Sequence, residues 1–111
     1  MANNKLKEIS GLKGLTKLRK LDLGANRIRV MEGFADLVNL EELWLGKNKI
    51  DEIQGLETLT KLRRLDVQSN RLTAVANLQA QVDTLEELYL SHNAIDNEGA
   101  AMETGLALTF P

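Results

Sequence analysis

With 111 residues, the chain is long enough for one small domain and lies near the lower size at which a domain buries a self-sufficient core. Its 16 acidic and 14 basic residues are intermixed, which argues against nucleic acid or an anionic membrane surface as a partner. The lack of cysteine excludes a disulfide scaffold and a thiolate metal site. The opening MANNKLKEIS is polar, and no run approaches the roughly 20 apolar residues of a membrane span. We therefore expect a protein of the nucleus and cytoplasm.

The dominant feature of the sequence is an internal repeat of about 22 residues. Four segments follow the pattern L-x-x-L-x-L-x-x-N-x-L, with Val or Ile at some leucine positions, and begin at Leu18, Leu40, Leu62 and Leu85. The repeated asparagines are Asn26, Asn48, Asn70 and Asn93, and Asn4 lies one period earlier. A repeat of this length predicts a solenoid, in which each coil covers the apolar face of the next.

The L-x-L part of each repeat predicts a short strand whose two apolar residues face the interior. We expect parallel strands near residues 20–24, 42–46, 64–68 and 87–91. The inward pairs are Leu21 and Leu23, Leu43 and Leu45, Leu65 and Val67, and Leu88 and Leu90. In the turn after each strand, the repeated Asn is suited to satisfy backbone groups of adjacent coils, so we interpret it as structural.

Between the strands, apolar residues recur at every third position, which is the spacing of a 3₁₀ turn. These residues are Leu12, Leu15 and Leu18, then Phe34, Leu37 and Leu40, then Leu56, Leu59 and Leu62. The next return is one residue longer, and we expect Leu78, Val82 and Leu85 to be its apolar positions. A residue type that tolerates positive φ precedes each return, namely Gly11, Gly33, Gly55 and Asn77.

Over roughly residues 4–95 the pattern resembles leucine-rich repeats of the 22-residue class. Within that class, the strings LGKNKI, QSNRLT and ELYLSHN resemble the nuclear leucine-rich-repeat regulatory subunits of protein phosphatase 1. The resemblance implies an α/β, right-handed solenoid with short parallel strands on its concave face and 3₁₀ or irregular convex returns. It also implies a non-enzymatic scaffold that holds the phosphatase catalytic subunit on the concave face.

We expect residues 1–111 to form a single leucine-rich-repeat domain of about four and a half repeats with both ends truncated. The pattern fails after Ile95, where Glu98 takes a position that is apolar in the earlier repeats. Proteins of the family carry further repeats and a terminal cap. We therefore expect the end coils to be the least stable part of the isolated chain.

The residues between the inward leucines point out of the concave face, where folding leaves their identity comparatively free. One column across the strands contains Asp22, Trp44, Asp66 and Tyr89. An exposed Trp and Tyr interleaved with carboxylates are typical of a protein-binding hot spot. We interpret these four residues as a docking stripe, with the rings as anchors and the carboxylates meeting basic groups. The alternative is that the rings merely lie flat over neighbouring strands.

Two further columns are charged, and their signs alternate from coil to coil. They are Arg19, Glu41, Arg63 and Glu86, and Lys20, Glu42, Arg64 and Glu87. Opposite charges on adjacent strands favour the correct stacking order, so we interpret the columns mainly as determinants of register and solubility. Glu42 and Glu87 adjoin the docking stripe and are also candidate partner-binding residues.

Catalytic features are weak. His92 is the sole histidine and has no nearby metal-ligand pattern, and Ser10, Ser69 and Ser91 lack a nucleophile-elbow context. Carboxylates two strands apart, at about 10 Å, lie farther apart than paired glycosidase acids, and no Gly-rich phosphate loop occurs. We therefore predict no enzyme, cofactor, metal or small-molecule substrate. The predicted function is binding of the protein phosphatase 1 catalytic subunit, and the alternative is an adaptor for a spliceosomal or cytoskeletal complex.

Overall fold

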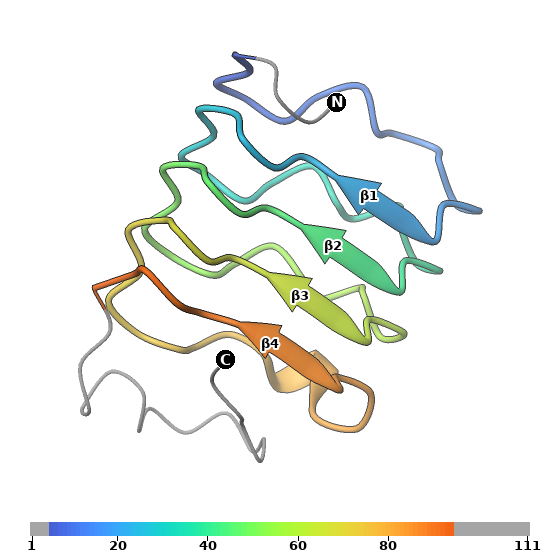
Figure 1. Ribbon diagram of the computed structural model, residues 1–111. Helices are drawn as coiled ribbons and strands as arrows, with labels where there is room; N and C mark the ends of the chain where they lie inside the picture. The colour runs from blue at the N-terminus through green and yellow to red at the C-terminus, as the bar shows by residue number, and fades with distance from the viewer. Residues whose placement is uncertain (1–4, 95–111) are drawn as a thin grey trace.

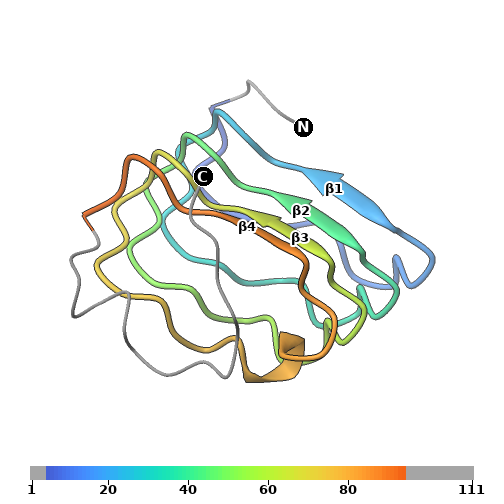
Figure 2. The same ribbon diagram turned by 60° about the horizontal axis from the view of Figure 1, so that its bottom comes forward.

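The computed structural model describes residues 5–94, which form stacked coils around one parallel sheet (Figure 1). The sheet has four strands in the order β1-β2-β3-β4, so chain neighbours are also sheet neighbours. The strands are β1 Lys20–Asp22, β2 Glu42–Trp44, β3 Arg64–Asp66 and β4 Glu87–Tyr89. Figure 2 shows the strands along one side of the coils and the returns along the other. These features confirm the predicted solenoid.

Each strand starts at the predicted residue and is shorter than predicted by two residues. Backbone pairing nevertheless continues beyond the strand ends, because the N–H of Leu23 donates to Trp44 O at 2.8 Å and that of Leu45 donates to Asp66 O at 2.7 Å. The pairing is in register, with Leu43 opposite both Leu21 and Leu65. Because each strand pairs in register with the next, equivalent residues of successive repeats lie in columns across the sheet.

The core lies between the strands and the returns. All eight predicted inward strand residues are buried, and Leu43, Leu45 and Leu65 are completely inaccessible. The returns contribute a second wall of buried residues, which includes Phe34, Leu37 and Leu40 and the equivalent Leu56, Leu59 and Leu62. Burial of such side chains contributes roughly 1.5–3 kcal/mol each, so the stacked coils together supply the core that one coil lacks.

The repeated asparagines form a hydrogen-bonded ladder through the turns after the strands, which confirms their structural role. Asn48 Nδ2 donates to Leu45 O in its own coil and to Leu23 O in the preceding coil, both at 3.0 Å. Its Oδ1 accepts the N–H of Ile28 at 3.0 Å. Asn70 and Asn93 repeat this arrangement. Asn26 likewise donates to Leu23 O in its own coil and accepts the N–H of Leu6, whereas Asn4 lies outside the described residues.

The returns begin with the predicted left-handed residues. The φ angles of Gly11, Gly33, Gly55 and Asn77 are 78°, 82°, 77° and 61°. At Gly55 a side chain is also excluded by close packing, because a Cβ would lie 2.7 Å from Met31 O. Hydrogen bonds between residues three apart, such as Leu37 N to Phe34 O at 2.9 Å, then fold each return as a succession of tight turns.

The described residues contain one 3₁₀ helix, η1 Gln79–Gln81, and no α-helix. Of the α/β class that was expected, the described residues thus contain helical structure only as the 3₁₀ helix η1 of the longest return. Within residues 5–94, no helix has the length and apolar composition needed to cross a membrane.

The prediction for the longest return was wrong at one position. Val82 is 39% exposed, and Gln81 is completely buried at the position equivalent to Leu59. Because η1 keeps the three-residue spacing from Leu78, the extra residue falls after Gln81 and Val82 turns outward. Gln81 Nε2 donates to Leu56 O at 2.8 Å and to Leu59 O at 3.0 Å, so its amide satisfies carbonyls of the preceding return.

Leu15 also departs from the prediction, because it is 43% exposed although Leu37 and Leu59 are fully buried. Leu37 and Leu59 each lie between two described coils. Leu15 belongs to the first described return, in the coil of the edge strand β1, so only one described coil packs beside it. The apolar spacing predicts which side chains point toward the interior. How deeply such a side chain is buried depends also on whether a neighbouring coil covers it.

The Asn ladder can be tested with Asn48→Ala. The substitution leaves the buried N–H of Ile28 without its acceptor and removes the donor shared by two buried carbonyls. Because each unsatisfied buried group costs roughly 1–3 kcal/mol, we expect a loss of about 3 kcal/mol in unfolding free energy, measured by urea denaturation.

The matched control is Asn39→Ala. Asn39 donates to Thr16 O at 2.7 Å, but this contact is exposed to solvent and water can replace it. We expect a loss below about 1 kcal/mol. Equal losses in the two variants would contradict the structural role of the ladder.

Candidate protein-binding site

The docking stripe lies on the outward face of the sheet, at the last residue of each strand. In the strand register Asp22 pairs with Trp44, Trp44 with Asp66, and Asp66 with Tyr89. The structure therefore brings together all four residues from four separate repeats. Their side chains alternate with inward leucines, which places them on the face opposite the core.

The two rings of the stripe contact each other across β3. The ring centroids of Trp44 and Tyr89 are 6.0 Å apart and the ring planes make an angle of 25°, which is a stacked arrangement. Both side chains are half-buried. Part of each ring is thus engaged within the chain, as in the alternative of rings lying over neighbouring strands, and the remainder faces solvent. The pair is a preformed aromatic surface rather than two independent rings.

Asp66 was expected to be an outward, accessible carboxylate, and the structure corrects this expectation. Asp66 is only 7% exposed, because it lies between Trp44 and Tyr89 in the strand register. Asp22 at the edge of the sheet remains exposed. The two acidic residues of the stripe therefore present different surfaces to a partner.

Each of these carboxylates also holds the turn after its strand. Asp22 Oδ1 accepts the N–H of Gly24 at 2.9 Å, and Asp66 Oδ1 accepts the N–H of Gln68 at 3.0 Å. A side-chain oxygen that binds the backbone two residues later is a common way to end a strand in a turn. The sequence carried a signal for these contacts, because an Asp side chain commonly accepts the backbone N–H two residues later, but the prediction of a surface column did not include this role.

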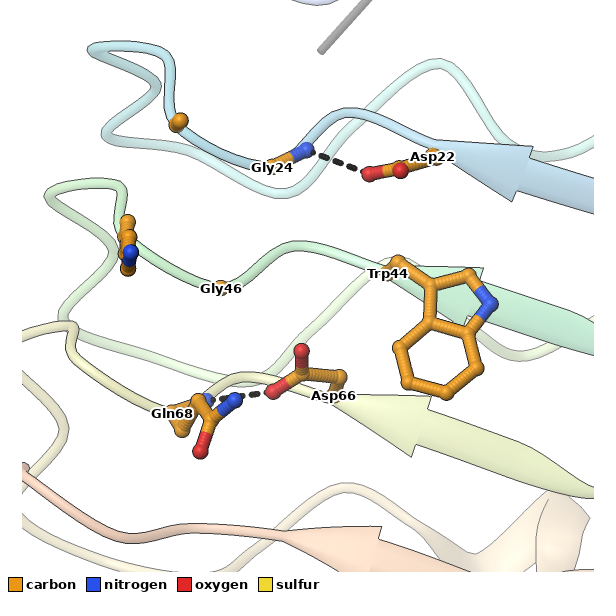
Figure 3. Close-up of a pocket in the computed structure, with 8 residues that line it drawn as sticks. Asp22, Gly24, Trp44, Gly46, Asp66 and Gln68 are labelled. Carbon is orange, nitrogen blue, oxygen red and sulfur yellow. Dashed lines mark hydrogen bonds between the residues drawn. The ribbon is translucent and has the colours of Figure 1, made fainter. Parts of the chain in front are cut away.

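A hollow of about 250 Å³ opens beside the stripe where the strands end (Figure 3). Its lining includes Asp22, Gly24, Trp44, Gly46, Asp66 and Gln68. Gly46 leaves room for the Asp66 carboxylate, because a Cβ at Gly46 would lie 2.9 Å from Asp66 Oδ2. The glycines and Gln68 were not among the predicted site residues. The hollow combines an indole, two carboxylates and backbone that a side chain can approach closely.

The electrostatics of the stripe follow from burial. Loss of solvent raises the pKa of Asp66 above its ordinary value, although hydrogen bonds from Gln68 act in the opposite direction. The nearby charge of Asp22 raises the pKa of Asp66 further. For Tyr89, burial is again the largest cause that raises the pKa, followed by the negative charge of Glu87. The carboxylates of Asp22 and Asp66 thus give the stripe a negative charge.

Glu42 connects the stripe to the charged columns. Its Oε1 accepts the indole N–H of Trp44 at 3.2 Å, and its Oε2 lies 3.5 Å from both Lys20 Nζ and Arg64 Nη1. Glu87 pairs with the same Arg64 from the other side. The structure therefore places both additional candidates next to the rings, Glu42 at Trp44 and Glu87 at Tyr89. Glu42 orients the indole, and both carboxylates pair with Arg64.

The second charged column also forms the predicted pairs. Glu41 contacts Arg19 at 3.7 Å and Arg63 at 3.8 Å, and Arg63 pairs in turn with Glu86. The hydrogen bond to Glu86 raises the pKa of Arg63, and the same contact lowers the pKa of Glu86. These pairs are solvent-exposed, so each contributes little alone and their combined effect is on register.

The described residues contain no group of three or more His, Cys, Asp or Glu side chains placed to hold a metal ion. His92 is exposed, and its φ of 59° places it in the turn before Asn93. Ser91 Oγ donates to Gln68 Oε1 at 3.1 Å, which is a contact between coils. These positions have turn and packing roles in the solenoid.

Comparison with known proteins agrees with this architecture. The model of two-copy leucine-rich repeats matches residues 38–80, and a second leucine-rich-repeat model matches residues 84–102. Together they account for more than half of the sequence. The chain belongs to the leucine-rich-repeat family.

A more specific similarity is to the protein phosphatase 1 regulatory inhibitor subunit PPP1R7 homolog of Arabidopsis thaliana. The identity is 43% over 47 residues, which are 42% of this chain and 14% of that protein. The chain is therefore related to a regulatory subunit of protein phosphatase 1, and the match spans a small part of that relative.

Solved structures of bacterial solenoids share the fold. Internalin C2 of Listeria monocytogenes superposes with a TM-score of 0.74 at 27% identity, covering 95% of this chain and 47% of the internalin. An internalin F of the same organism gives 0.66 at 25% identity, covering 96% of this chain and 38% of that structure. The chain spans less than half the length of either internalin.

The burial of Asp66 leads to a prediction about pH. Its pKa is higher in the folded state than in the unfolded chain, so stability falls as the pH rises through that pKa. Asn keeps an oxygen for the Gln68 N–H and carries no charge. We expect Asp66→Asn to unfold at a higher temperature than the parent at neutral pH. The difference should disappear at roughly pH 3, below the ordinary aspartate pKa of about 3.9.

The control is Asp22→Asn, which makes the same chemical change at an exposed position. We expect a smaller effect at neutral pH. A difference for Asp66→Asn that stays constant between neutral and acidic pH would show that the charge of Asp66 is not the cause.

Proposed function

We propose that the chain is a non-enzymatic protein-binding scaffold whose concave face docks the catalytic subunit of protein phosphatase 1. The observation that carries the proposal is the stacked pair of Trp44 and Tyr89, half-buried on the outward face of the sheet and bordered by carboxylates. The identity of the partner is supported by the similarity to a phosphatase regulatory subunit.

The physical reason is the contact area that the rings still offer. A Trp or Tyr that is only half covered within its own chain gains most by burial against a partner. The stacking holds the two rings in place, so little side-chain entropy is lost when they bind. A partner surface can therefore use them as an immobile platform.

The carboxylates define the chemistry of the complementary surface. Asp22 is exposed, Asp66 has its second oxygen beside Gly46 in the hollow, and Glu87 is partly exposed at the end of its column. A Lys or Arg of the partner fits this environment, because its charge meets the carboxylates and its cationic group can contact the indole face. We expect the partner surface to be basic and partly apolar.

The second candidate is an adaptor for another intracellular assembly, such as a spliceosomal or cytoskeletal complex. The shared fold supports it, since leucine-rich repeats present many different binding surfaces on one scaffold. Affinity capture from cell extract with mass spectrometry separates the candidates: phosphatase catalytic subunit among the strongest hits favours the first. Either role fits the proposed location in the nucleus and cytoplasm.

The direct test is titration of the purified phosphatase 1 catalytic subunit with the parent chain and with Trp44→Ala. An anchor residue at the centre of an interface contributes about 2 kcal/mol or more, so we expect the Kd to rise roughly 30-fold or more. Tyr89→Ala should have the same direction of effect, because it removes the stacking partner of the indole.

Two controls accompany this titration. Arg63→Ala removes an exposed ladder residue and Lys61→Glu changes a residue of the convex return, and both should bind within about twofold of the parent. Circular dichroism must show that every variant is folded. If both ring variants bind like the parent while Lys61→Glu abolishes binding, the stripe is not the docking surface.

A further inference from the structure

A second surface of the solenoid carries charges of one sign. A basic residue stands directly after four of the five repeated Asn positions, and these residues are Lys5, Arg27, Lys49 and Arg71, whereas Ala94 follows Asn93. We call this column the basic edge. It follows the stacked turns after the strands, which form one border of the coils in Figure 1.

Backbone hydrogen bonds hold the turns of the basic edge directly above one another. The N–H of Arg27 donates to Leu6 O at 2.7 Å, that of Lys49 to Ile28 O at 2.8 Å, and that of Arg71 to Ile50 O at 2.7 Å. Each bond joins a basic residue to the residue that follows the previous cation. Successive cations are therefore about one strand spacing apart, roughly 4.8 Å at the backbone.

The basic edge differs from the charged columns of the sheet, where signs alternate. None of its four cations forms an ion pair with another residue of the described segment 5–94. Like charges on adjacent strands repel, so folding alone does not favour this arrangement. Acidic residues lie between the four cations along the chain, so the sequence contains no continuous basic segment. The 22-residue period brings the cations together in one column and leaves the acidic residues outside it.

A hollow of about 710 Å³ lies beside the edge. Its lining contains four cations, namely Lys7, Arg27, Arg29 and Lys49, against the two carboxylates of Glu8 and Glu32. Val30 also lines the hollow and is 45% exposed, which offers an apolar contact. The hollow therefore extends the positive surface of the edge and adds a place for a nonpolar side chain.

We propose that the basic edge and this hollow bind an acidic segment of a protein in an extended conformation, running from coil to coil. Carboxylates on one side of an extended chain repeat at about 6.6–7 Å, and long Lys and Arg side chains can span the difference from the coil spacing. The surface is separate from the docking stripe, so this inference goes beyond the proposed phosphatase-binding function.

The surroundings favour an acidic peptide over a nucleic acid. Sequence-independent binding of single strands uses aromatic side chains on which bases stack. The aromatic residues within 5–94 lie elsewhere, since Phe34 is buried in the core and Trp44 and Tyr89 belong to the outward face of the sheet. The carboxylates of Glu8 and Glu32 in the lining of the hollow interrupt the positive surface, which disfavours a polyanionic backbone.

The experiment titrates the chain into a fluorescein-labelled oligoglutamate peptide and follows fluorescence anisotropy at low and moderate salt. We expect saturable binding that weakens as salt increases, because the contact is between charges. The double variant Arg27→Gln/Lys49→Gln should bind about tenfold more weakly or worse. The control Lys13→Gln/Lys17→Gln makes the same change of charge at exposed residues of the first return and should stay within about twofold of the parent.

A stability measurement shows that the variant is folded. Because the substitutions relieve repulsion between coils, Arg27→Gln/Lys49→Gln should unfold at a temperature equal to or above that of the parent at low salt. A clearly lower unfolding temperature would mean that the cations have structural partners, which overturns the inference.

Other outcomes are equally decisive. Unchanged oligoglutamate binding by the double variant, or an equal loss in the control, would contradict the assignment of the basic edge. Tighter binding of an oligouridine RNA that competes with oligoglutamate would identify a nucleic-acid surface and overturn the proposed partner class. Trp44→Ala should bind oligoglutamate like the parent, so failure of this inference is distinguishable from failure of the phosphatase proposal.

Discussion

The buried amide of the repeated Asn is the interaction on which the rest of the structure depends. Each turn after a strand carries backbone groups into the interior, where an unpaired N–H or C=O is costly. Asn48 satisfies such groups in two coils at once, because it bonds to its own strand end and to the preceding turn. The same geometry recurs in each coil only if the coils have nearly the same length. The Asn ladder thereby fixes the period, and the inserted residue of the longest return is accommodated on the opposite side, directly after η1.

Fixed register converts the sequence repeat into surface columns with distinct properties. On the sheet face, opposite charges such as Arg63 and Glu41 face each other from coil to coil and favour the correct stacking. Beside them, Trp44 and Tyr89 meet over Asp66 although 44 positions separate them in the chain. Along the turns, Lys5, Arg27, Lys49 and Arg71 form a basic column. The apolar interior constrains none of these outward residues directly, so their arrangement is free to serve binding.

The sequence predicted those features that depend on residue type at a repeated spacing. Strand positions, the Asn ladder, the left-handed residues before the returns and the alternating charges belong to this group. It did not predict the burial of Gln81 in place of Val82, because the extra residue can follow either one and only packing decides. Likewise, the burial of Asp66 results from two rings that lean together across a strand, which spacing alone does not show. The basic edge is not evident from the sequence, because acidic and basic residues are intermixed along the chain.

The central claim is that the aromatic pair on the sheet face meets the partner. The chain has one Trp, so biosynthetic incorporation of 5-fluorotryptophan gives a single fluorine label at Trp44. We predict that its ¹⁹F resonance shifts or broadens when unlabelled phosphatase 1 catalytic subunit is added, and stays unchanged when oligoglutamate is added. An unchanged resonance under conditions in which sedimentation shows that the phosphatase complex has formed would contradict the claim.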